Sequence, residues 1–501
     1  MEPTAPTFSD LCRHLWEAAN ILRGPVDAAD FKTYIFPLLF FKRVSDVWDE
    51  EVEKAREGFE DEFVDFPENH RFQIPPGCHW ADVRKATTDV GARLQAALRE
   101  IEQENPGTLF GIFGDAGWTN KDRLSDALLV DLLEHFSAIP LSIKAVTADA
   151  LGNAYEFLIK QFADKANKKA GEFYTPRPVV NLMVRLLAPR GGDTIYDPAC
   201  GTGGMLLAAV EHVRNAGGKV ETLFGKLYGQ EKNLTTSAIA RMNLFLHEVE
   251  DFRVCRGDTL REPRFLEGDA LMRFDCVIAN PPFSLEKWGV DEWEADPYHR
   301  NIAGTPPQKS GDYAWVQHML ASLKPSTGRM AVVLPHGALF RMAAEGKIRK
   351  KLLEMDLLDA VIGLGPNLFY GTGLAACVLL FRARKPESHK RKVLFVDASR
   401  LFKKGRNQNE LLPAHAERIY ELVAKYEDAP GEAKVVSLDD ILTEHGGNLN
   451  ISLYVEPPQT HTVPTVAESL ARLKESLAAA YAAEDRLADL LKANGLLTEE
   501  N

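Results

Sequence analysis

One stretch decides the fold class of this 501-residue chain: Asp197-Pro198-Ala199-Cys200-Gly201-Thr202-Gly203-Gly204-Met205. It follows the short apolar run 194–197 and precedes the helical pattern 205–214, so a strand ends in a carboxylate, a glycine-rich turn follows, and a helix begins. Glycines allow the backbone to approach a ligand closely at the carboxyl end of a sheet, where α/β folds bind their cofactors. The stretch therefore predicts a cofactor loop in an α/β fold.

The spacing of the glycines disfavours two common cofactor motifs. A dinucleotide-binding fingerprint has the pattern G-x-G-x-x-G, but the sixth residue counted from Gly201 is Leu206. A phosphate-binding loop requires Gly-Lys followed by Ser or Thr, and that sequence is missing here. The loop therefore favours neither NAD nor ATP.

Around this loop, short β-rich runs alternate with helical stretches, an order typical of a parallel sheet covered by helices. The sequence predicts strands at 194–197, 227–231, 252–255, 274–279, 329–334, 357–363, 375–381 and 393–396, and helices at 205–214, 234–248, 313–323 and 347–353. The last strands have short connections, whereas parallel neighbours require a crossover of about a dozen residues. We therefore expect an antiparallel hairpin at the end of a mostly parallel sheet.

Helical segments flank the predicted sheet on both sides. Apolar residues at helical spacing, interrupted by a proline-rich loop at 66–80, predict a helical N-terminal domain. At 466–491, apolar residues in alternating three- and four-residue steps predict a helix about 40 Å long, which forms either a coiled-coil arm for a partner or a helix folded back on its own domain. The predicted domains are 1–166 (helical), 167–455 (sheet and cofactor loop) and 456–501 (C-terminal arm).

Composition and charge limit the class of protein. Apolar residues make up 45% and charged residues 26%, which predicts a folded chain. The net charge of −13 means that any contact with DNA must be local or shared with a partner. Six scattered cysteines without a C-x-x-C pair argue against a disulfide framework or structural zinc. With no signal-peptide pattern and no apolar run of ~18–20 residues, we expect a cytoplasmic protein that does not enter a membrane.

A second motif, Asn280-Pro281-Pro282-Phe283, follows the predicted strand 274–279. Two consecutive prolines fix the backbone and remove two N–H donors, so the Asn280 side-chain oxygen and the Pro281 carbonyl remain as acceptors for an NH₂ group. The ring of Phe283 supplies a flat face on which a planar group can stack. The motif therefore predicts a site for a planar substrate that carries an amino group.

The two motifs resemble those of the DNA adenine-N6 methyltransferases that use S-adenosylmethionine, whose hallmarks are D-P-A-C-G-T-G-G and N-P-P-F. The chain further resembles the modification subunit of type I restriction–modification systems. That narrower likeness rests on Gly171-Glu172-Phe173-Tyr174-Thr175-Pro176-Arg177-Pro178, Gly229-Gln230-Glu231 and Asn367-Leu368-Phe369-Tyr370-Gly371-Thr372-Gly373. It covers nearly the whole chain and implies a Rossmann-like methyltransferase domain.

The resemblance implies roles for individual residues. The catalytic motif would be Asn280, Pro281, Pro282 and Phe283, with Phe283 stacking on an adenine flipped out of the duplex. The S-adenosylmethionine site would comprise Glu172, Phe173, Tyr174, Thr175, Pro176, Arg177, Asp197, Gly201, Thr202, Gly203, Gly204, Glu231 and Asp258. Within it, Glu231 would bind the ribose hydroxyls, Asp258 the amino group of the cofactor adenine, and Asp197 would lie near the methionine end. No metal is predicted.

The resemblance also implies partners. Because no segment reads as a base-recognition domain, target choice on the DNA substrate would come from a specificity subunit. In the family this subunit is bound by modification subunits usually present in two copies, with an optional restriction subunit.

Several alternatives stay open from the residues alone. An N4-cytosine or protein-glutamine methyltransferase also fits N-P-P-aromatic, and a non-catalytic scaffold could keep the fold and only bind nucleic acid or partners. Asp258 could be a helix-cap or turn aspartate, and Asp197 a strand-end aspartate bonded to loop amides. Four basic groups are candidates for phosphate contacts or for plain solvated surface: 347–351, 382–385, 390–392 and 403–406.

Overall fold

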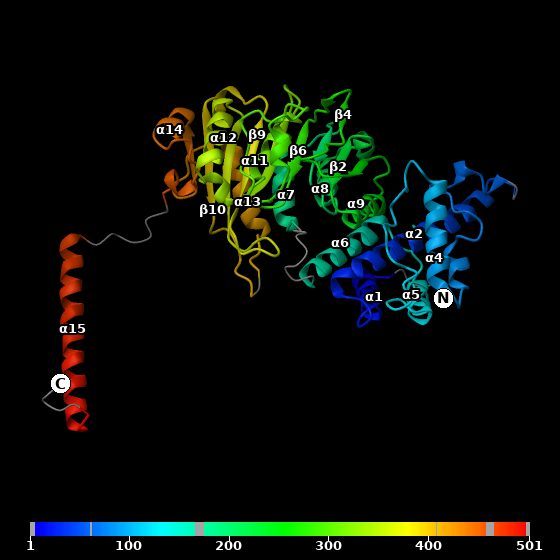
Figure 1. Ribbon diagram of the computed structural model, residues 1–501, viewed down its shortest axis with the longest axis horizontal. Coiled ribbons are helices and arrows are strands. Elements are labelled where there is room, and N and C mark those ends of the chain that lie inside the picture. The colour runs from blue at the N-terminus through cyan, green and yellow to red at the C-terminus, as the bar shows by residue number, and fades with distance from the viewer. Residues whose placement is uncertain (1–5, 61–62, 166–174, 407, 457–464, 497–501) are drawn as a thin grey trace. The chain divides into compact units, whose positions relative to one another are not determined.

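The structure of the protein is a computed structural model that describes residues 6–60, 63–165, 175–406, 408–456 and 465–496 (Figure 1). The chain divides into two compact units, Met1–Val455 and Glu456–Asn501. Among the described residues, no helix combines the length and apolarity needed to cross a membrane.

The larger unit contains a nine-stranded sheet in the order β11-β10-β8-β9-β7-β6-β1-β2-β3. The strands are β1 (Ile195–Asp197), β2 (Leu227–Glu231), β3 (Arg253–Arg256), β6 (Cys276–Ala279), β7 (Arg329–Pro335), β8 (Leu358–Leu364), β9 (Ala376–Arg382), β10 (Lys392–Ala398) and β11 (Ala433–Ser437). The neighbours from β3 to β7 are parallel, β9 is antiparallel to both β7 and β8, and β10 is parallel to β8. The mostly parallel Rossmann-like sheet is confirmed, and β8 and β9 form the expected antiparallel pair.

Two features of the sheet differ from the sequence prediction. Strand β11 pairs antiparallel with β10 at the edge and was not predicted, because this short strand is only partly buried and has no continuous apolar run. A separate two-stranded ribbon, β4 (Leu266–Glu267) and β5 (Ala270–Leu271), is too short to give a periodic signal. Neither feature changes the order of the central strands.

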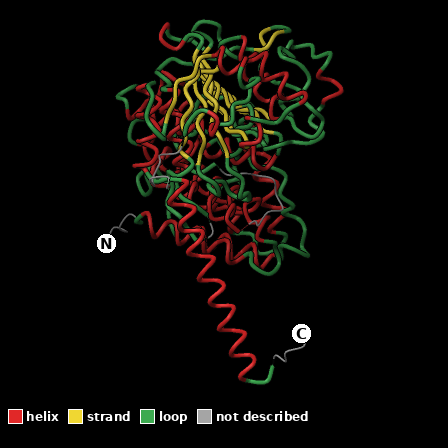
Figure 2. The backbone as a smooth tube through the Cα atoms, turned by 90° about the vertical axis from the view of Figure 1, so that its left-hand side faces the viewer, coloured by secondary structure: helices red, strands yellow, loops and turns green. Residues whose placement is uncertain are grey.

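Helices cover both faces of the sheet, which Figure 2 shows as one twisted layer of strands between helices. In β7, Ala331 and Val333 belong to an apolar cluster with α7 (Arg177–Leu187) and α8 (Gly204–Asn215). The alternate residues of β7 belong to the opposite cluster with α11 (Asp312–Ala321) and α12 (Ala343–Glu354). Burial on both faces is why these strands read as continuous apolar runs. The remaining helices of this part are α9 (Leu234–Leu246), α10 (Val290–Trp293), α13 (Pro413–Lys425) and α14 (Leu438–Thr443).

The N-terminal helices share an apolar core with the sheet region. They are α1 (Phe8–Ile21), α2 (Phe31–Arg56), α3 (Trp80–Arg84), α4 (Val90–Glu104), α5 (Asp126–Ser137) and α6 (Ala148–Lys165). Helix α9 joins the two parts, because Ile239 and Met242 pack in the core of the N-terminal helices while Ala240 and Leu244 pack under the sheet. The N-terminal helices are thereby held beside the strands that carry the predicted site.

The second unit contains α15 (Val466–Ala493), which begins with a capping box between Thr465 and Glu468. The predicted helix is confirmed. Its leucines are exposed as far as this unit is described: Leu470 is 51% exposed, Leu473 56% and Leu477 45%.

Candidate active site

A cavity of about 330 Å³ lies at the carboxyl ends of the central strands. Asp197 ends β1, Glu231 ends β2, Asp258 follows β3, and Asn280 follows β6. These four side chains are far apart in the sequence, but the parallel order of their strands brings them to one edge, and all four line the cavity. The other predicted site residues in its wall are Thr175, Gly201, Thr202, Gly204 and Pro282.

The glycine-rich loop forms the tight turn that its sequence predicts. Gly201 and Gly203 have φ angles of +53° and +81°, a left-handed conformation that glycine adopts without strain. Gly204 begins α8 and lines the cavity, and a Cβ atom added to it would meet no atom within 4 Å. In β2, a Cβ at Gly229 would lie 2.9 Å from Cys200 Sγ, so the glycine allows the loop to approach the strand.

Two carboxyl groups at the strand ends hold the loop in different ways. Asp197 Oδ1 accepts a hydrogen bond from the Ala199 N–H at 3.0 Å. Glu231 accepts one from the Gly201 N–H at 3.1 Å and another from the Asn233 N–H at 2.8 Å. Asp197 is therefore a strand-end aspartate bonded to a loop amide, which is one of the two roles predicted for it.

Asp197 has an unusual electrostatic environment. Burial, with a smaller contribution from the charge of Glu231, raises the pKa of Asp197 to about 8, although the Ala199 hydrogen bond acts against this rise. No cation among the described residues forms an ion pair with Asp197. A buried carboxyl group without a counter-charge provides a place for a cationic ligand group.

Asp258 combines a turn role with an ion pair. Its Oδ1 accepts a hydrogen bond from the Leu260 N–H at 3.2 Å, as the turn alternative predicts. Its Oδ2 lies 2.9 Å from Lys232 Nζ, and both residues line the cavity. The carboxylate is thus fixed in position at the cavity wall.

Asn280 presents an unsatisfied acceptor. Its Nδ2 donates a hydrogen bond to Thr175 Oγ1 at 2.9 Å, which fixes the plane of the amide. Its Oδ1 is buried and has no hydrogen-bond partner within the described part of the chain. An unpaired buried acceptor costs ~1–3 kcal/mol. Asn243 and Asn301 also have such an oxygen, but of the three asparagines only Asn280 lines the cavity, where a ligand could supply the missing donor.

A buried network supports the residue that follows Phe283. Ser284 has a φ of +48°, an uncommon conformation for a residue with a side chain. Asp312, on α11, accepts a hydrogen bond from the Ser284 N–H at 2.7 Å and pairs with Arg341 at 2.8 Å. Arg341 donates in turn to Ser284 Oγ at 3.0 Å. This network holds the backbone directly after the N-P-P-F motif.

Other predicted residues lie beside the cavity rather than in its wall. The Phe283 ring makes an edge contact with Phe369 at 5.9 Å between centroids, and Gly203 packs against α9. Pro176 and Pro281 are not in the wall, and Arg177 forms ion pairs with Glu156 at 2.9 Å and Glu211 at 2.6 Å. Glu172, Phe173 and Tyr174 fall outside the described residues.

Several residues in the wall were not predicted from the sequence. The N-terminal helices contribute Lys32, Phe36 and Phe162, and the sheet region contributes Trp315 and Tyr370. Phe36 gives no distinct signal, because an aromatic residue at helical spacing reads the same in a core and in a cavity wall. Tyr370 belongs to the 367–373 motif, from which the sequence predicts no role for this side chain.

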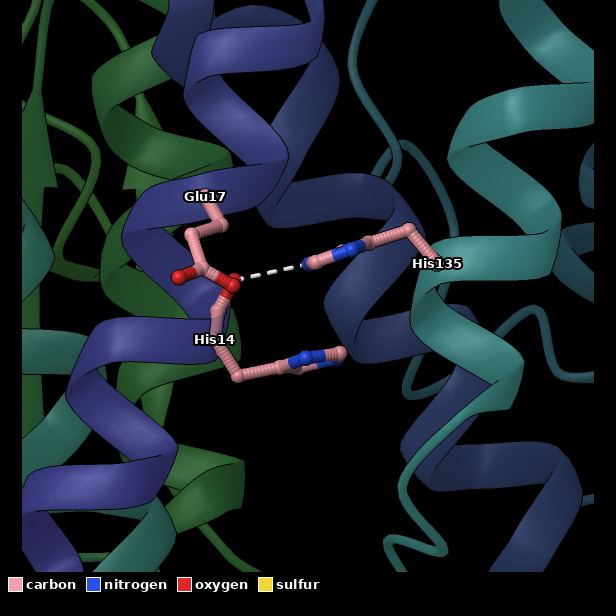
Figure 3. Close-up of side chains that lie close together, drawn as sticks. All are labelled: His14, Glu17 and His135. Atoms are coloured by element: carbon pink, nitrogen blue, oxygen red, sulfur yellow. Dashed lines mark hydrogen bonds between the residues drawn. The ribbon is translucent and has the colours of Figure 1, made fainter.

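Outside the cavity, one group of described side chains meets the distance requirement for a metal site: His14, Glu17 and His135 (Figure 3). Their ligand atoms lie within 4.8 Å of one another. The imidazole rings are stacked with centroids 4.0 Å apart and planes at 11°, and His135 Nε2 contacts the His14 carbonyl oxygen at 2.8 Å. In parallel rings the nitrogen lone pairs do not converge on one point. Burial lowers the pKa of His14 to about 4, so this ring is neutral and can stack without charge repulsion.

The fold and the cavity together define an α/β methyltransferase of the Rossmann-like type. Residues 146–462 match the family profile described as N-6 DNA methylase, and residues 11–136 match the HsdM N-terminal domain. The chain therefore belongs to the N-6 DNA methylase family, among the methylase subunits of type I restriction enzymes.

The chain is similar to other proteins along most of their length. The type I restriction enzyme MjaVII methylase subunit of Methanocaldococcus jannaschii is 33% identical over 494 residues, which cover 94% of this chain and 82% of that protein. The type I restriction enzyme MpnII methylase subunit of Mycoplasma pneumoniae is 29% identical, with 88% of each chain covered. A crystal structure of the type I restriction–modification methyltransferase subunit from Streptococcus thermophilus has a TM-score of 0.79 at 32% identity and covers 90% of this chain and 100% of that one.

Proposed function

We propose that the chain transfers a methyl group from S-adenosylmethionine to the N6 atom of adenine in DNA, as the modification subunit of a type I restriction–modification complex. The observation that carries the proposal is the buried Oδ1 of Asn280, which has no hydrogen-bond partner among the described residues, at a cavity lined by Asn280 and by the glycine-rich cofactor loop. Membership of the N-6 DNA methylase family supports adenine as the methyl acceptor. The amino group of adenine is the kind of donor that this oxygen lacks.

The residues in the wall fit S-adenosylmethionine. Asp197 is buried without a counter-cation and would face the ammonium group of the methionine part. Glu231 would accept hydrogen bonds from the ribose hydroxyls, and Asp258, held by Lys232, would accept one from the amino group of the cofactor adenine. The open space over Gly204 leaves room for the ligand.

The proposed chemistry depends on hydrogen-bond acceptors rather than on a strong base. When bound, the cofactor supplies a methyl group on a positively charged sulfur. The amino nitrogen of adenine is a poor nucleophile because its lone pair is delocalised into the ring. Asn280 Oδ1 and the Pro281 carbonyl would hold its two N–H groups, and these bonds strengthen as the nitrogen becomes tetrahedral and positively charged. They would therefore stabilise the transition state more than the bound substrate.

A methylation assay with identification of the methylated base tests the proposal. The complete complex should label DNA with radioactive methyl groups from S-adenosylmethionine, and hydrolysis should yield N6-methyladenine. If the product is N4-methylcytosine, the methyl acceptor is cytosine and not adenine. Cofactor binding without any methylated DNA in the complete complex would favour the scaffold alternative.

The first prediction concerns pH. Because the pKa of Asp197 is raised to about 8, its carboxyl group is mostly protonated at pH 7 in the free protein. An ammonium group beside it favours the carboxylate and lowers this pKa, so binding should release nearly one proton at pH 7. Affinity should rise with pH to a maximum near 8 and fall above it, because the α-amino group of the ligand, with an ordinary pKa of ~7.7–8.0, then loses the charge that Asp197 binds. Calorimetry in buffers with different ionisation enthalpies measures the release, and Asp197→Asn should remove it. Equal release from wild type and variant would contradict this role.

We also propose a division of labour along the chain. Residues 167–455 would bind the cofactor and catalyse transfer, 1–166 would complete the cavity wall, and 456–501 would contact a specificity subunit. The complex would contain two modification subunits and DNA, with a restriction subunit as an optional further member. Lys32 and Phe36 in the cavity wall support the second assignment, and the exposed leucines of α15 support the third.

The second prediction tests the proposed contact. Deleting residues 467–501 should weaken assembly with the specificity subunit, because it removes the helix that carries these exposed leucines. Cofactor affinity should stay unchanged, because the cavity belongs to the other unit. Size-exclusion chromatography with the specificity subunit and calorimetry with S-adenosylmethionine measure the two effects. Undiminished assembly would assign the contact to another surface.

A further inference from the structure

We propose that three side chains after β10, Lys403, Lys404 and Arg406, bind the DNA backbone beside the target adenine; we call them the basic loop. This inference rests on the proposed function and specifies how an acidic chain holds its nucleic-acid substrate. It adds a binding surface that lies outside the catalytic motifs.

The four basic groups noted in the sequence differ in their surroundings. In the groups 382–385 and 390–392, most of the cations are already neutralised. Arg382 pairs with Asp359 and Lys385 with Asp356, each at 2.7 Å. Two further ion pairs join Lys390 to Glu387 and Arg391 to Asp439. The pairs of Arg382 and Lys385 are partly buried, whereas those of Lys390 and Arg391 are exposed and weak. In all four, a carboxylate competes with phosphate for the cation.

The basic loop, by contrast, keeps its charge available. Lys403, Lys404 and Arg406 are exposed, and no carboxylate among the described residues forms an ion pair with any of them. The turn that carries them is closed by backbone hydrogen bonds of 2.8 and 2.9 Å between Lys403 and Glu410. A Cβ at Gly405 would lie 1.9 Å from the Gln408 carbonyl oxygen, so the two sides of the turn approach closely at this glycine.

Hydrogen bonds attach the turn to the segment that leads into the cavity wall. Asn409 donates a hydrogen bond from its backbone N–H to the Asn367 carbonyl oxygen at 2.9 Å and another from Nδ2 to the Pro366 carbonyl oxygen at 2.8 Å. Gln408 Nε2 donates to the Leu368 carbonyl at 2.6 Å. The turn therefore lies directly against the segment 366–368.

The same segment continues to the catalytic motif. Phe369 contacts Phe283 with ring centroids 5.9 Å apart, and the next two residues, Tyr370 and Gly371, line the cavity. Strand β10 also has the same direction as β1 and β6, so its carboxyl end lies at the edge of the sheet that holds the cavity. The three cations, which form no ion pair with the described residues, thus lie on a turn that is bonded to segment 366–368. The next residues of that segment reach Phe283 and the cavity.

The fourth basic group, 347–351 on α12, has exposed lysines but a different location. Helix α12 starts after the carboxyl end of β7 and returns to the start of β8, so Lys350 and Lys351 lie toward the edge of the sheet opposite the cavity. A flipped nucleotide requires its own phosphates to be held near the cavity. The position of the basic loop meets this requirement, and that of α12 does not. The lysines of α12 therefore provide a matched control.

The test measures how DNA affinity depends on salt. A triple variant, Lys403→Gln, Lys404→Gln and Arg406→Gln, is compared with an α12 variant that changes the net charge equally: Lys350→Gln and Lys351→Gln, together with Lys392→Gln at the start of β10, on the same edge of the sheet. Each full-length chain is assembled with its specificity subunit and titrated with duplex DNA that lacks the target site. Because each neutralised phosphate contributes ~0.9 to the slope of log K against log salt, the basic-loop variant should lose roughly 2–3 from the slope. The α12 variant should match wild type.

Different outcomes separate the inference from the function on which it rests. A wild-type complex that does not methylate DNA refutes the proposed function. A methylating wild type whose slope is unchanged in the basic-loop variant refutes the inference alone. Loss of assembly with the specificity subunit in that variant would also overturn it, since the loop would then be a protein contact. If the triple variant does not fold, Lys404→Gln alone should lower the slope by ~0.9.

Discussion

Asn280→Ala should lower the rate of methyl transfer by roughly 10²–10³-fold, the size of effect seen when a preorganised hydrogen-bonding group is removed from a transition state. Asn280 lines the cavity, and its amide oxygen is buried without a hydrogen-bond partner among the described residues, so this acceptor would be available to the target nitrogen when the base enters. Cofactor affinity should change little, because this acceptor serves the base and not the cofactor. Single-turnover methylation with saturating cofactor measures the effect.

Two related variants sharpen this test. Asn280→Asp keeps acceptor oxygens at the same place and should retain more activity than Asn280→Ala. Thr175→Val removes the oxygen that accepts the Asn280 Nδ2 hydrogen bond, so the amide plane loses its anchor and the rate should fall by less than in Asn280→Ala. Wild-type transfer by Asn280→Ala in the complete complex would show that another group holds the amine.

The parts of this site that could be predicted are those that local sequence determines. Asp197, Glu231 and Asn280 each follow an apolar strand, and a parallel sheet brings such strand ends to one edge. Knowledge of the strands was therefore enough to expect that the three side chains would meet. The same local reasoning applied to Gly201 and Gly203, whose left-handed φ angles are typical of a glycine-rich turn.

Long-range contacts could not be predicted in this way. Arg177 reads as part of a cofactor motif, yet its guanidinium pairs with Glu156 and Glu211, which come from two other helices. Asp312 and Arg341 are distant in the sequence from Ser284. The packing of α11 brings Asp312 to it, and the segment between β7 and α12 brings Arg341. No periodicity or spacing records such contacts, because they depend on the tertiary arrangement.

The supporting network also explains how Ser284, directly after the motif, keeps a strained backbone conformation. A φ of +48° at Ser284 persists only where surrounding bonds fix it, and Asp312 supplies the bond to its N–H. Asp312 is 1% exposed and Arg341 balances its charge, so the pair is costly to break. The backbone after Phe283 is therefore set by α11, and the direction of the N-P-P-F motif depends on a helix outside it.

Gly201, Gly203 and Gly204 look equivalent in the sequence, but their surroundings in the structure differ, and Gly204 is the one to substitute. Gly204→Asp should abolish binding of S-adenosylmethionine. A Cβ at Gly204 meets no atom within 4 Å and the residue lines the cavity, so the new side chain would occupy the ligand's space. It would also place a second negative charge near Asp197 and Glu231. Isothermal calorimetry should show no binding at cofactor concentrations that saturate wild type.

This loss should occur without unfolding, which makes the variant informative. Gly204 is the first residue of α8 and has no left-handed φ, and a carboxylate in the first turn of a helix is favourable by ~0.3–1 kcal/mol. Gly203→Ala is the matched control, because its Cβ would lie 3.4 Å from the Ala240 carbonyl oxygen of α9 and away from the ligand. Its φ of +81° predicts a loss of about 1 kcal/mol in stability, seen as a lower Tm, with cofactor affinity largely retained. Wild-type affinity in a folded Gly204→Asp variant would place the cofactor elsewhere and refute the loop assignment, since no ligand bound against this turn could accommodate the added carboxylate.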